Sequence, residues 1–105
     1  MVTNNEVINS TIQNYVEDVK NAMPIDKVFL FGSYAKGSAN EHSDIDLCFF
    51  SDSFENQDAF GIVKKLFRMT RKYKGMDIQP KAFAMSDLET DNPFVKEILR
   101  TGKEL

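Results

Sequence analysis

Residues 31–50 read FGSYAKGSANEHSDIDLCFF and join two apolar runs through a segment rich in glycine, serine and other small residues. The run at residues 28–31 is short, continuous and apolar, which is typical of a strand buried on both faces. The run at residues 44–50 also predicts a strand, and because side chains alternate along a strand, Asp44 and Asp46 share one face. This stretch therefore predicts two strands joined by a helical turn and a loop.

Three longer helices are expected around these strands. Apolar residues at three- and four-residue steps predict a helix over residues 4–23, and Pro24 ends it. The same spacing predicts a helix over residues 55–74, while Asn92-Pro93 begins a last helix as cap and first residue. The inward face of the middle helix is expected to contain Ala59, Val63, Leu66, Phe67, Thr70 and Tyr73.

Residues 76–85 alternate as a third strand, and Pro80 indicates that this strand lies at a sheet edge or contains a bulge. Four of its side chains are expected on one face: Asp77, Gln79, Lys81 and Phe83. The order of elements predicts an α/β (α+β) fold, a small mixed sheet flanked by helices. A chain of 105 residues is long enough for one core, so a single domain over residues 1–105 is expected.

Composition narrows the range of functions. The chain is 42% hydrophobic, which predicts a packed core, and its net charge of −3 disfavours nucleic acid as the main partner. The single Cys48 cannot form an internal disulfide, and no leader or long apolar segment is evident. A cytoplasmic protein without a membrane segment is expected.

Two features of residues 31–50 indicate phosphoryl chemistry. Gly32-Ser33 at the end of a strand and the start of a helical turn can present backbone N–H groups to a phosphate. Asp44 and Asp46 lie about 7 Å apart along the strand, close enough to share hard cations such as Mg²⁺. Two such ions stabilise the attacking and leaving oxygens of an in-line displacement at phosphorus, which calls for a third carboxylate. Asp77 is the best candidate because it opens the third strand, and it could also take the acceptor proton.

The spacing Gly-Ser, ten residues, Asp-x-Asp resembles the signature of the DNA polymerase beta-like nucleotidyltransferase superfamily, and most closely its minimal branch (MNT). The resemblance implies that Gly32 and Ser33 bind the triphosphate. It also implies that Asp44, Asp46 and Asp77 are the catalytic residues and bind the metal, two Mg²⁺ ions. The implied reaction transfers AMP from ATP, or a nucleoside monophosphate from another triphosphate, to an acceptor hydroxyl.

The resemblance also implies a partner. Minimal members resemble antitoxins that pair with HEPN-domain proteins, and some adenylylate a tyrosine of that partner, so an antitoxin with a HEPN-type acceptor is expected. Many relatives carry arginine where this chain has Tyr34 and Lys36, and Lys36 supplies a positive charge for nucleotide binding. Two alternatives remain open: a binding module that neutralises a HEPN partner by contact alone, and a small-molecule enzyme that modifies an antibiotic hydroxyl.

Other chemically active residues have plainer interpretations. His42 is expected to be an exposed loop residue, and Cys48 a buried thiol of the core. Lys81 is as compatible with an exposed strand lysine as with a phosphate contact. The basic residues of segment 64–74 are expected to be solvated, with RNA or an acidic partner as the alternative. The apolar residues of the last helix could belong to the core or to a partner surface: Phe94, Val95, Ile98 and Leu99.

Overall fold

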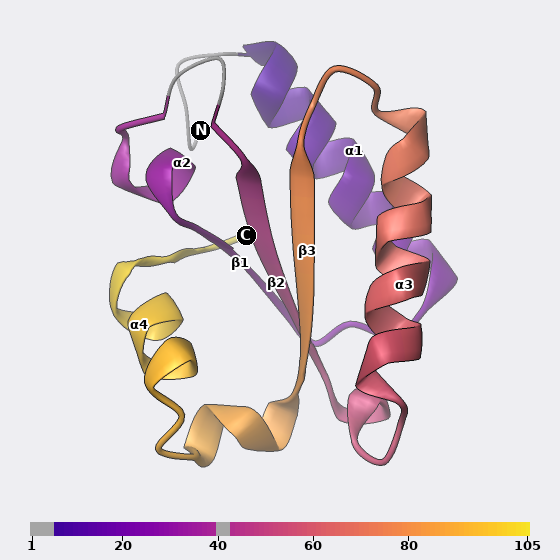
Figure 1. The fold of residues 1–105 in the computed structure, drawn as a ribbon, viewed down its shortest axis with the longest axis vertical. Coiled ribbons are helices and arrows are strands. Elements are labelled where there is room, and N and C mark those ends of the chain that lie inside the picture. The colour runs from indigo at the N-terminus through magenta and orange to yellow at the C-terminus, as the bar shows by residue number, and fades with distance from the viewer. Residues whose placement is uncertain (1–5, 40–42) are drawn as a thin grey trace.

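A mixed four-stranded sheet forms the centre of the computed structural model, which describes residues 6–39 and 43–105 (Figure 1). The spatial order is β3-β2-β1-β4. The pair β2–β3 is parallel, whereas β1 runs antiparallel to both β2 and β4. The strands are β1 (Lys27–Phe31), β2 (Ile45–Ser51), β3 (Ile78–Ala84) and β4 (Lys103–Glu104). The expected fold class, a small mixed sheet flanked by helices, is confirmed.

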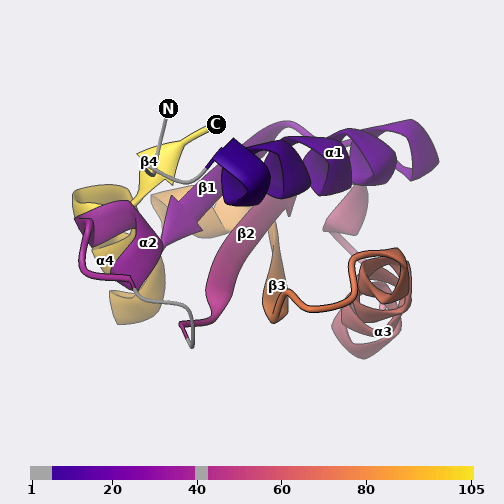
Figure 2. The ribbon, with the colours of Figure 1, turned by 90° about the horizontal axis from the view of Figure 1, so that it is seen from above.

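Helices cover both faces of this sheet. Figure 2 shows α1 and α3 toward one side and α4 toward the other. The α-helices are α1 (Glu6–Ala22), α2 (Ser33–Lys36), α3 (Ala59–Met69) and α4 (Pro93–Thr101), and the 3₁₀ turns are η1 (Asp52–Phe54), η2 (Thr70–Lys72) and η3 (Met85–Glu89). In the part of the chain that the structure describes, no helix is both long and apolar enough to cross a membrane.

The larger core lies between the sheet and the pair α1 and α3. Helix α1 contributes a buried stripe that includes Tyr15 and Val19, and α3 contributes Leu66. The Tyr15 hydroxyl donates a hydrogen bond of 2.8 Å to the Leu66 carbonyl oxygen, so the polar group of this fully buried ring is satisfied. This bond joins the two helices across the face of the sheet.

The smaller core lies under α4. Phe29, Cys48 and Phe50 of the sheet pack with Val95 and Ile98 of the helix. Cys48 is therefore a buried thiol, as expected, and burial raises its pKa to about 12. A thiol with so high a pKa remains protonated at neutral pH and is a poor nucleophile.

Helix α4 begins where the sequence predicted. The Asn92 side chain accepts hydrogen bonds from the backbone N–H groups of Phe94 (2.9 Å) and Val95 (3.4 Å), and Pro93 occupies the first turn. The position of Pro80 is also confirmed, because β3 is an edge strand of the sheet. In the stripe of α4, Val95 and Ile98 belong to the core, whereas Phe94 and Leu99 are exposed.

The predicted middle helix was too long and its inward face was partly wrong. The α-helix covers only 59–69, because the Asp58 side chain caps its start by accepting from Phe60 N–H and a 3₁₀ turn follows Met69. Leu66 is buried as expected, and Ile62 is buried with it. Ala59 and Phe67 are exposed, and Val63, Thr70 and Tyr73 are half-buried. Apolar residues occur on both sides of this helix, so periodicity alone favoured the wrong stripe.

The burial of α3 gives a direct test of this orientation. We predict that Leu66→Ala lowers the free energy of unfolding by about 2–5 kcal/mol, because it leaves a cavity at the centre of the larger core. Phe67→Ala, one position along the same helix, is expected to change it by no more than about 1 kcal/mol. Urea unfolding of both variants measures the difference. Equal destabilisation by the two substitutions would contradict the observed helix orientation.

Candidate functional site

The candidate site lies at one end of the strands, the edge of the sheet at which β1 ends and β2 and β3 begin. Because β2 and β3 are parallel, their first residues are neighbours, with Ile45 paired to Ile78. The Ile45 N–H donates a hydrogen bond of 2.8 Å to the Asp77 carbonyl oxygen, which fixes the residue before β3 beside the start of β2. Asp44 and Asp77 each immediately precede a strand, so they are brought together from positions 33 residues apart.

The third strand that reaches this edge is β1, which runs in the direction opposite to β2 and β3. Strand β1 is antiparallel to β2, so its last residue, Phe31, is paired with Asp46. Gly32 follows directly and turns the chain into α2 with a φ of 76°. The end of β1 therefore lies against the second carboxylate, as the spacing of the Gly-Ser and Asp-x-Asp elements predicted.

The carboxylates influence one another electrostatically. The pKa of Asp44 is raised, first by a side-chain hydrogen bond with Asp77 and then by the charge of Asp77. The pKa of Asp46, which is half-buried, is raised mainly by burial; the charge of Lys81 opposes this shift and that of Asp77 adds to it. The site thus concentrates negative charge at the start of β2 and β3.

These residues provide the donor chemistry of a divalent cation site but not a closed cage. In segments 6–39 and 43–105, no group of three or more His, Cys, Asp or Glu side chains is arranged so that it could hold a metal ion. The observed unit is a hydrogen-bonded pair, Asp44 and Asp77, with Asp46 close enough to feel the charge of Asp77. A hard cation prefers carboxylate oxygens and relieves the same repulsion that raises these pKa values, so the residues fit such an ion.

Gly32 is required at this edge for two reasons. Its positive φ is disfavoured for residues with a side chain, and a Cβ atom at this position would lie 2.5 Å from Asp46 Oδ2. Only a residue without a side chain lets the main chain approach the carboxylate so closely. Ser33, half-buried, begins α2, and the exposed Lys36 ends it. The structure therefore brings Gly32 against Asp46, with Ser33 and Lys36 on the four-residue helix that follows.

Tyr34 has a structural role that the sequence did not reveal. Its side chain is 5% exposed and belongs to the larger core. Arginine at this position would have to place a charge in that core, so the tyrosine is an adaptation of the core as well as a departure from the motif. Among the expected loop residues, His42 lies outside the described part of the chain.

Two further residues of β3 belong to the site. Gln79 donates a hydrogen bond of 2.6 Å from Nε2 to Asp77 Oδ1 and so holds the side chain that opens the strand. The charge of Lys81 lowers the pKa of both Asp44 and Asp46, and its Nζ lies 5.6 Å from the centre of the Phe31 ring. The alternation along β3 placed these residues on the face of Asp77, and the structure adds that the charge of Lys81 lies near the carboxylates.

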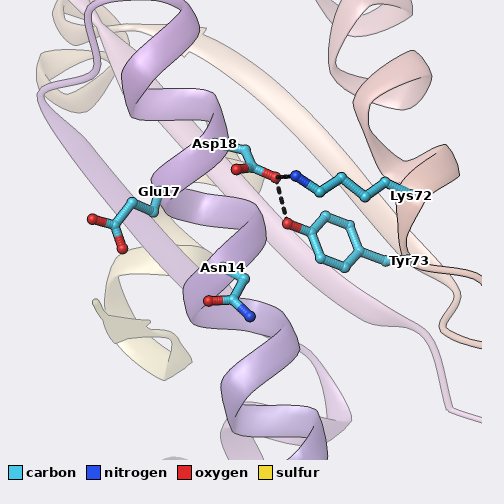
Figure 3. A pocket seen from close by; sticks show the side chains of 5 residues that line it. All are labelled: Asn14, Glu17, Asp18, Lys72 and Tyr73. Atoms are coloured by element: carbon cyan, nitrogen blue, oxygen red, sulfur yellow. Dashed lines mark hydrogen bonds and ion pairs between the residues drawn. The ribbon is translucent and has the colours of Figure 1, made fainter.

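A separate recess lies between α1 and the end of α3 (Figure 3). Asp18 accepts a hydrogen bond from the Tyr73 hydroxyl and forms an ion pair of 3.1 Å with Lys72 Nζ. The pKa of Asp18 is lowered, first by the hydrogen bond from Tyr73 and then by the hydrogen bond from Lys72. Asp18, Lys72 and Tyr73 satisfy one another and connect α1 to the turn that follows α3, so the recess is a contact between elements of the fold.

Comparison with solved structures agrees with this fold. A structure from Sulfolobus solfataricus, described as a nucleotidyltransferase, superimposes with a TM-score of 0.63 at 22% identity over 76% of this chain and 69% of its own. A mutant of the MntA–HepT toxin–antitoxin pair gives a TM-score of 0.65 at 19% identity over 89% of this chain and 69% of its own. No significant match is found among curated proteins.

The family is established by the sequence itself. The model of the family described as "Nucleotidyltransferase domain" matches residues 12–100. This range begins inside α1, ends inside α4 and includes every element between them. That range contains the Gly-Ser pair and the three aspartates, Asp44, Asp46 and Asp77. This chain belongs to the nucleotidyltransferase domain family.

Proposed function

We propose that this protein is a Mg²⁺-dependent enzyme that transfers AMP from ATP to a hydroxyl group of a HEPN-type partner protein, and that it acts as the antitoxin of a toxin–antitoxin pair. The observation that carries this proposal is the convergence of Asp44, Asp46 and Asp77 beside Gly32 at one edge of the sheet. The family match supports nucleotidyl transfer as the reaction class. The fold shared with MntA–HepT supports the kind of partner.

The carboxylates have distinct tasks in this proposal. Asp44, Asp46 and Asp77 would hold Mg²⁺, which when bound supplies positive charge that stabilises the phosphoryl oxygens. The acceptor oxygen forms a bond to the α-phosphorus of ATP while the bond from that phosphorus to pyrophosphate breaks. Asp77 is exposed and Gln79 orients its side chain, so an acceptor hydroxyl can reach it and it can receive the proton.

The triphosphate would be bound by the other half of the site. Gly32 and Ser33 provide main chain that a phosphate can approach closely, and Lys36 adds a positive charge at the end of α2. Lys81 faces the carboxylates from β3 and adds a second positive charge. Two point charges from lysine would then replace the forked guanidinium groups of many relatives.

Two observations favour a second candidate, an antitoxin that neutralises its partner by contact alone. The described carboxylates do not form a closed three-residue metal group, and Tyr34 is committed to the core. A protein that only binds would still need the fold but not the charge repulsion at its edge. The raised pKa of Asp44, caused by Asp77, and that of Asp46, caused mainly by burial, favour the enzyme, because each costs stability and serves no purpose in a contact-only protein.

Transfer activity tests the proposal. We expect the wild-type protein, purified with any bound partner, to label a protein with ATP labelled at the α-phosphorus in the presence of Mg²⁺. Asp44→Asn/Asp46→Asn should reduce transfer by roughly two orders of magnitude or more, because the charges that hold the cation are removed. Asp91→Asn, at a fully exposed carboxylate on the surface, is the matched control. The contact-only antitoxin would be supported if neither wild type nor the double variant labels a bound partner and both bind that partner equally well.

Because the pKa of Asp46 is raised, replacing its carboxylate by a neutral side chain should stabilise the fold, and the gain should depend on pH. Because the folded pKa is raised, the ionised form destabilises the fold above that pKa, and this cost disappears as the carboxylate protonates at lower pH. Asp46→Asn should therefore melt at a higher temperature than wild type near neutral pH, and the difference should shrink toward about pH 4. Mg²⁺ should raise the melting temperature of wild type more than that of the variant. An equal difference at both pH values would contradict this account.

Kinetics can distinguish a phosphate-binding role of Lys81 from a merely structural one. Lys81→Met keeps the length of the side chain and removes its charge, so kcat/KM for ATP should fall roughly 10- to 100-fold through loss of a charged contact to phosphate. Lys81→Arg should recover part of the activity, and Lys103→Met on β4 should have no effect. Steady-state kinetics with varied ATP measures all three variants. Unchanged kinetics in Lys81→Met would remove this residue from the site.

A further inference from the structure

Helix α3 carries an unusual outer surface. Phe60 is 75% exposed and Phe67 is 40% exposed, although both are large apolar side chains. They are seven residues apart, so they lie on one side of the helix about 10 Å from each other along its axis. Lys64 follows Phe60 by four residues and lies on the same side of α3, and Arg71 follows Phe67 by four in the 3₁₀ turn η2 that continues the helix. We name these four residues the outer stripe.

The outer stripe is not needed to pack the fold. The side of α3 that faces the sheet is formed by Ile62 and Leu66, which are buried, together with the half-buried Met69. The two phenylalanines on the opposite side leave apolar area in water, most of the surface of Phe60 and 40% of that of Phe67. Exposed apolar residues that recur along one helix face, with polar residues between and around them, are typical of a protein interaction surface.

The same segment carries a concentrated positive charge. Residues 59–74 contain no Asp or Glu, although the chain has 16 acidic residues in total. Six of the 13 Lys and Arg residues lie in this segment: Lys64, Lys65, Arg68, Arg71, Lys72 and Lys74. Lys72 pairs with Asp18, whereas Lys64, Lys65, Arg68 and Arg71 form no ion pair with any described residue. An otherwise acidic protein thus presents one face that attracts negative charge.

The outer stripe also leads toward the candidate site. Figure 1 shows α3 running alongside β3 toward the end of the sheet at which β2 and β3 begin. The chain needs only the residues between Arg71 and Asp77 to pass from the stripe to the carboxylate at the start of β3. A partner lying along α3 would therefore have one end near the edge that holds Asp44 and Asp77.

We propose that the outer stripe is the docking surface for the acceptor protein, and that the matching surface of that protein is an apolar groove or helix face flanked by acidic side chains. This inference rests on the proposed function for the identity of the partner as acceptor. Phe60 and Phe67 enter the apolar part, and the lysines and arginines around them pair with its acidic rim. Aromatic residues and arginine are the side chains that contribute most to such interfaces.

A protein surface fits the stripe better than a single-stranded nucleic acid does. The stripe lies on a convex helix, a shape that enters a groove between the elements of a partner. The two rings are about 10 Å apart, whereas neighbouring bases of a strand stack at about 3.4 Å, so successive bases cannot occupy both rings without being splayed apart. The net charge of the whole chain also opposes a polyanion more than it opposes a locally acidic protein.

Binding of defined probes tests the inference. The probe is a fluorescent amphipathic helical peptide with a leucine stripe flanked by glutamates; a peptide with lysines in place of the glutamates and a single-stranded RNA are the comparisons. Anisotropy titrations use the full chain without Mg²⁺ or ATP. We expect the acidic peptide to bind, and Phe60→Ala/Phe67→Ala to weaken its binding at least tenfold. Leu99→Ala, which removes a residue 45% exposed on α4, should leave the affinity unchanged.

Three results would overturn the inference: no binding of the acidic peptide, equal binding of the lysine peptide, or binding that the double phenylalanine variant retains. Binding of the RNA that depends on Phe60 and Phe67, with none of the peptide, would identify the stripe as a nucleic-acid surface instead. Unfolding of each variant by urea shows that the loss is not a loss of fold. Because Asp44→Asn/Asp46→Asn should keep full peptide affinity, failure of docking and failure of the transferase activity can be told apart.

Discussion

The parallel pairing of β2 with β3 is the constraint on which the rest of the site depends. It places the residues before two strands side by side, and so it brings Asp44 and Asp77 together although each carries a negative charge. The hydrogen bond from Ile45 N–H to the Asp77 carbonyl fixes this arrangement through the main chain, where side-chain repulsion cannot easily undo it. The hydrophobic cores on both faces of the sheet supply the stability that this crowding costs.

Charge crowding of this kind is characteristic of a site that binds positive charge. Lys81 provides part of this positive charge from within the chain, since it lowers the pKa values of both Asp44 and Asp46. The close approach of Gly32 to Asp46 leaves no room for a side chain between the end of β1 and the carboxylate. The proposed phosphate site and the proposed metal site therefore share one edge of the sheet, and a substitution of Gly32 is expected to affect both.

Much of this arrangement could be predicted from local sequence. The N-cap at Asn92, the edge position of Pro80 and the position of Asp46 on β2, with Asp44 just before the strand, follow from backbone chemistry that acts over a few residues. The orientation of α3 could not, because Ile62 and Leu66 on one side and Phe60 and Phe67 on the other satisfy a helical period equally well. The core position of Tyr34 and the role of Lys81 depend on contacts between distant segments, which no local pattern contains.

The central claim is that Asp44, Asp46 and Asp77 together bind a divalent cation beside the triphosphate. The most direct measurement is a crystal structure of the protein grown with Mn²⁺ and a non-hydrolysable ATP analogue, with the metal located by its anomalous scattering. We expect an anomalous peak bordered by the three carboxylates, with the α-phosphate of the analogue at the same edge. Full occupancy of the analogue without a peak at these carboxylates, or with the metal bound elsewhere, would contradict the account.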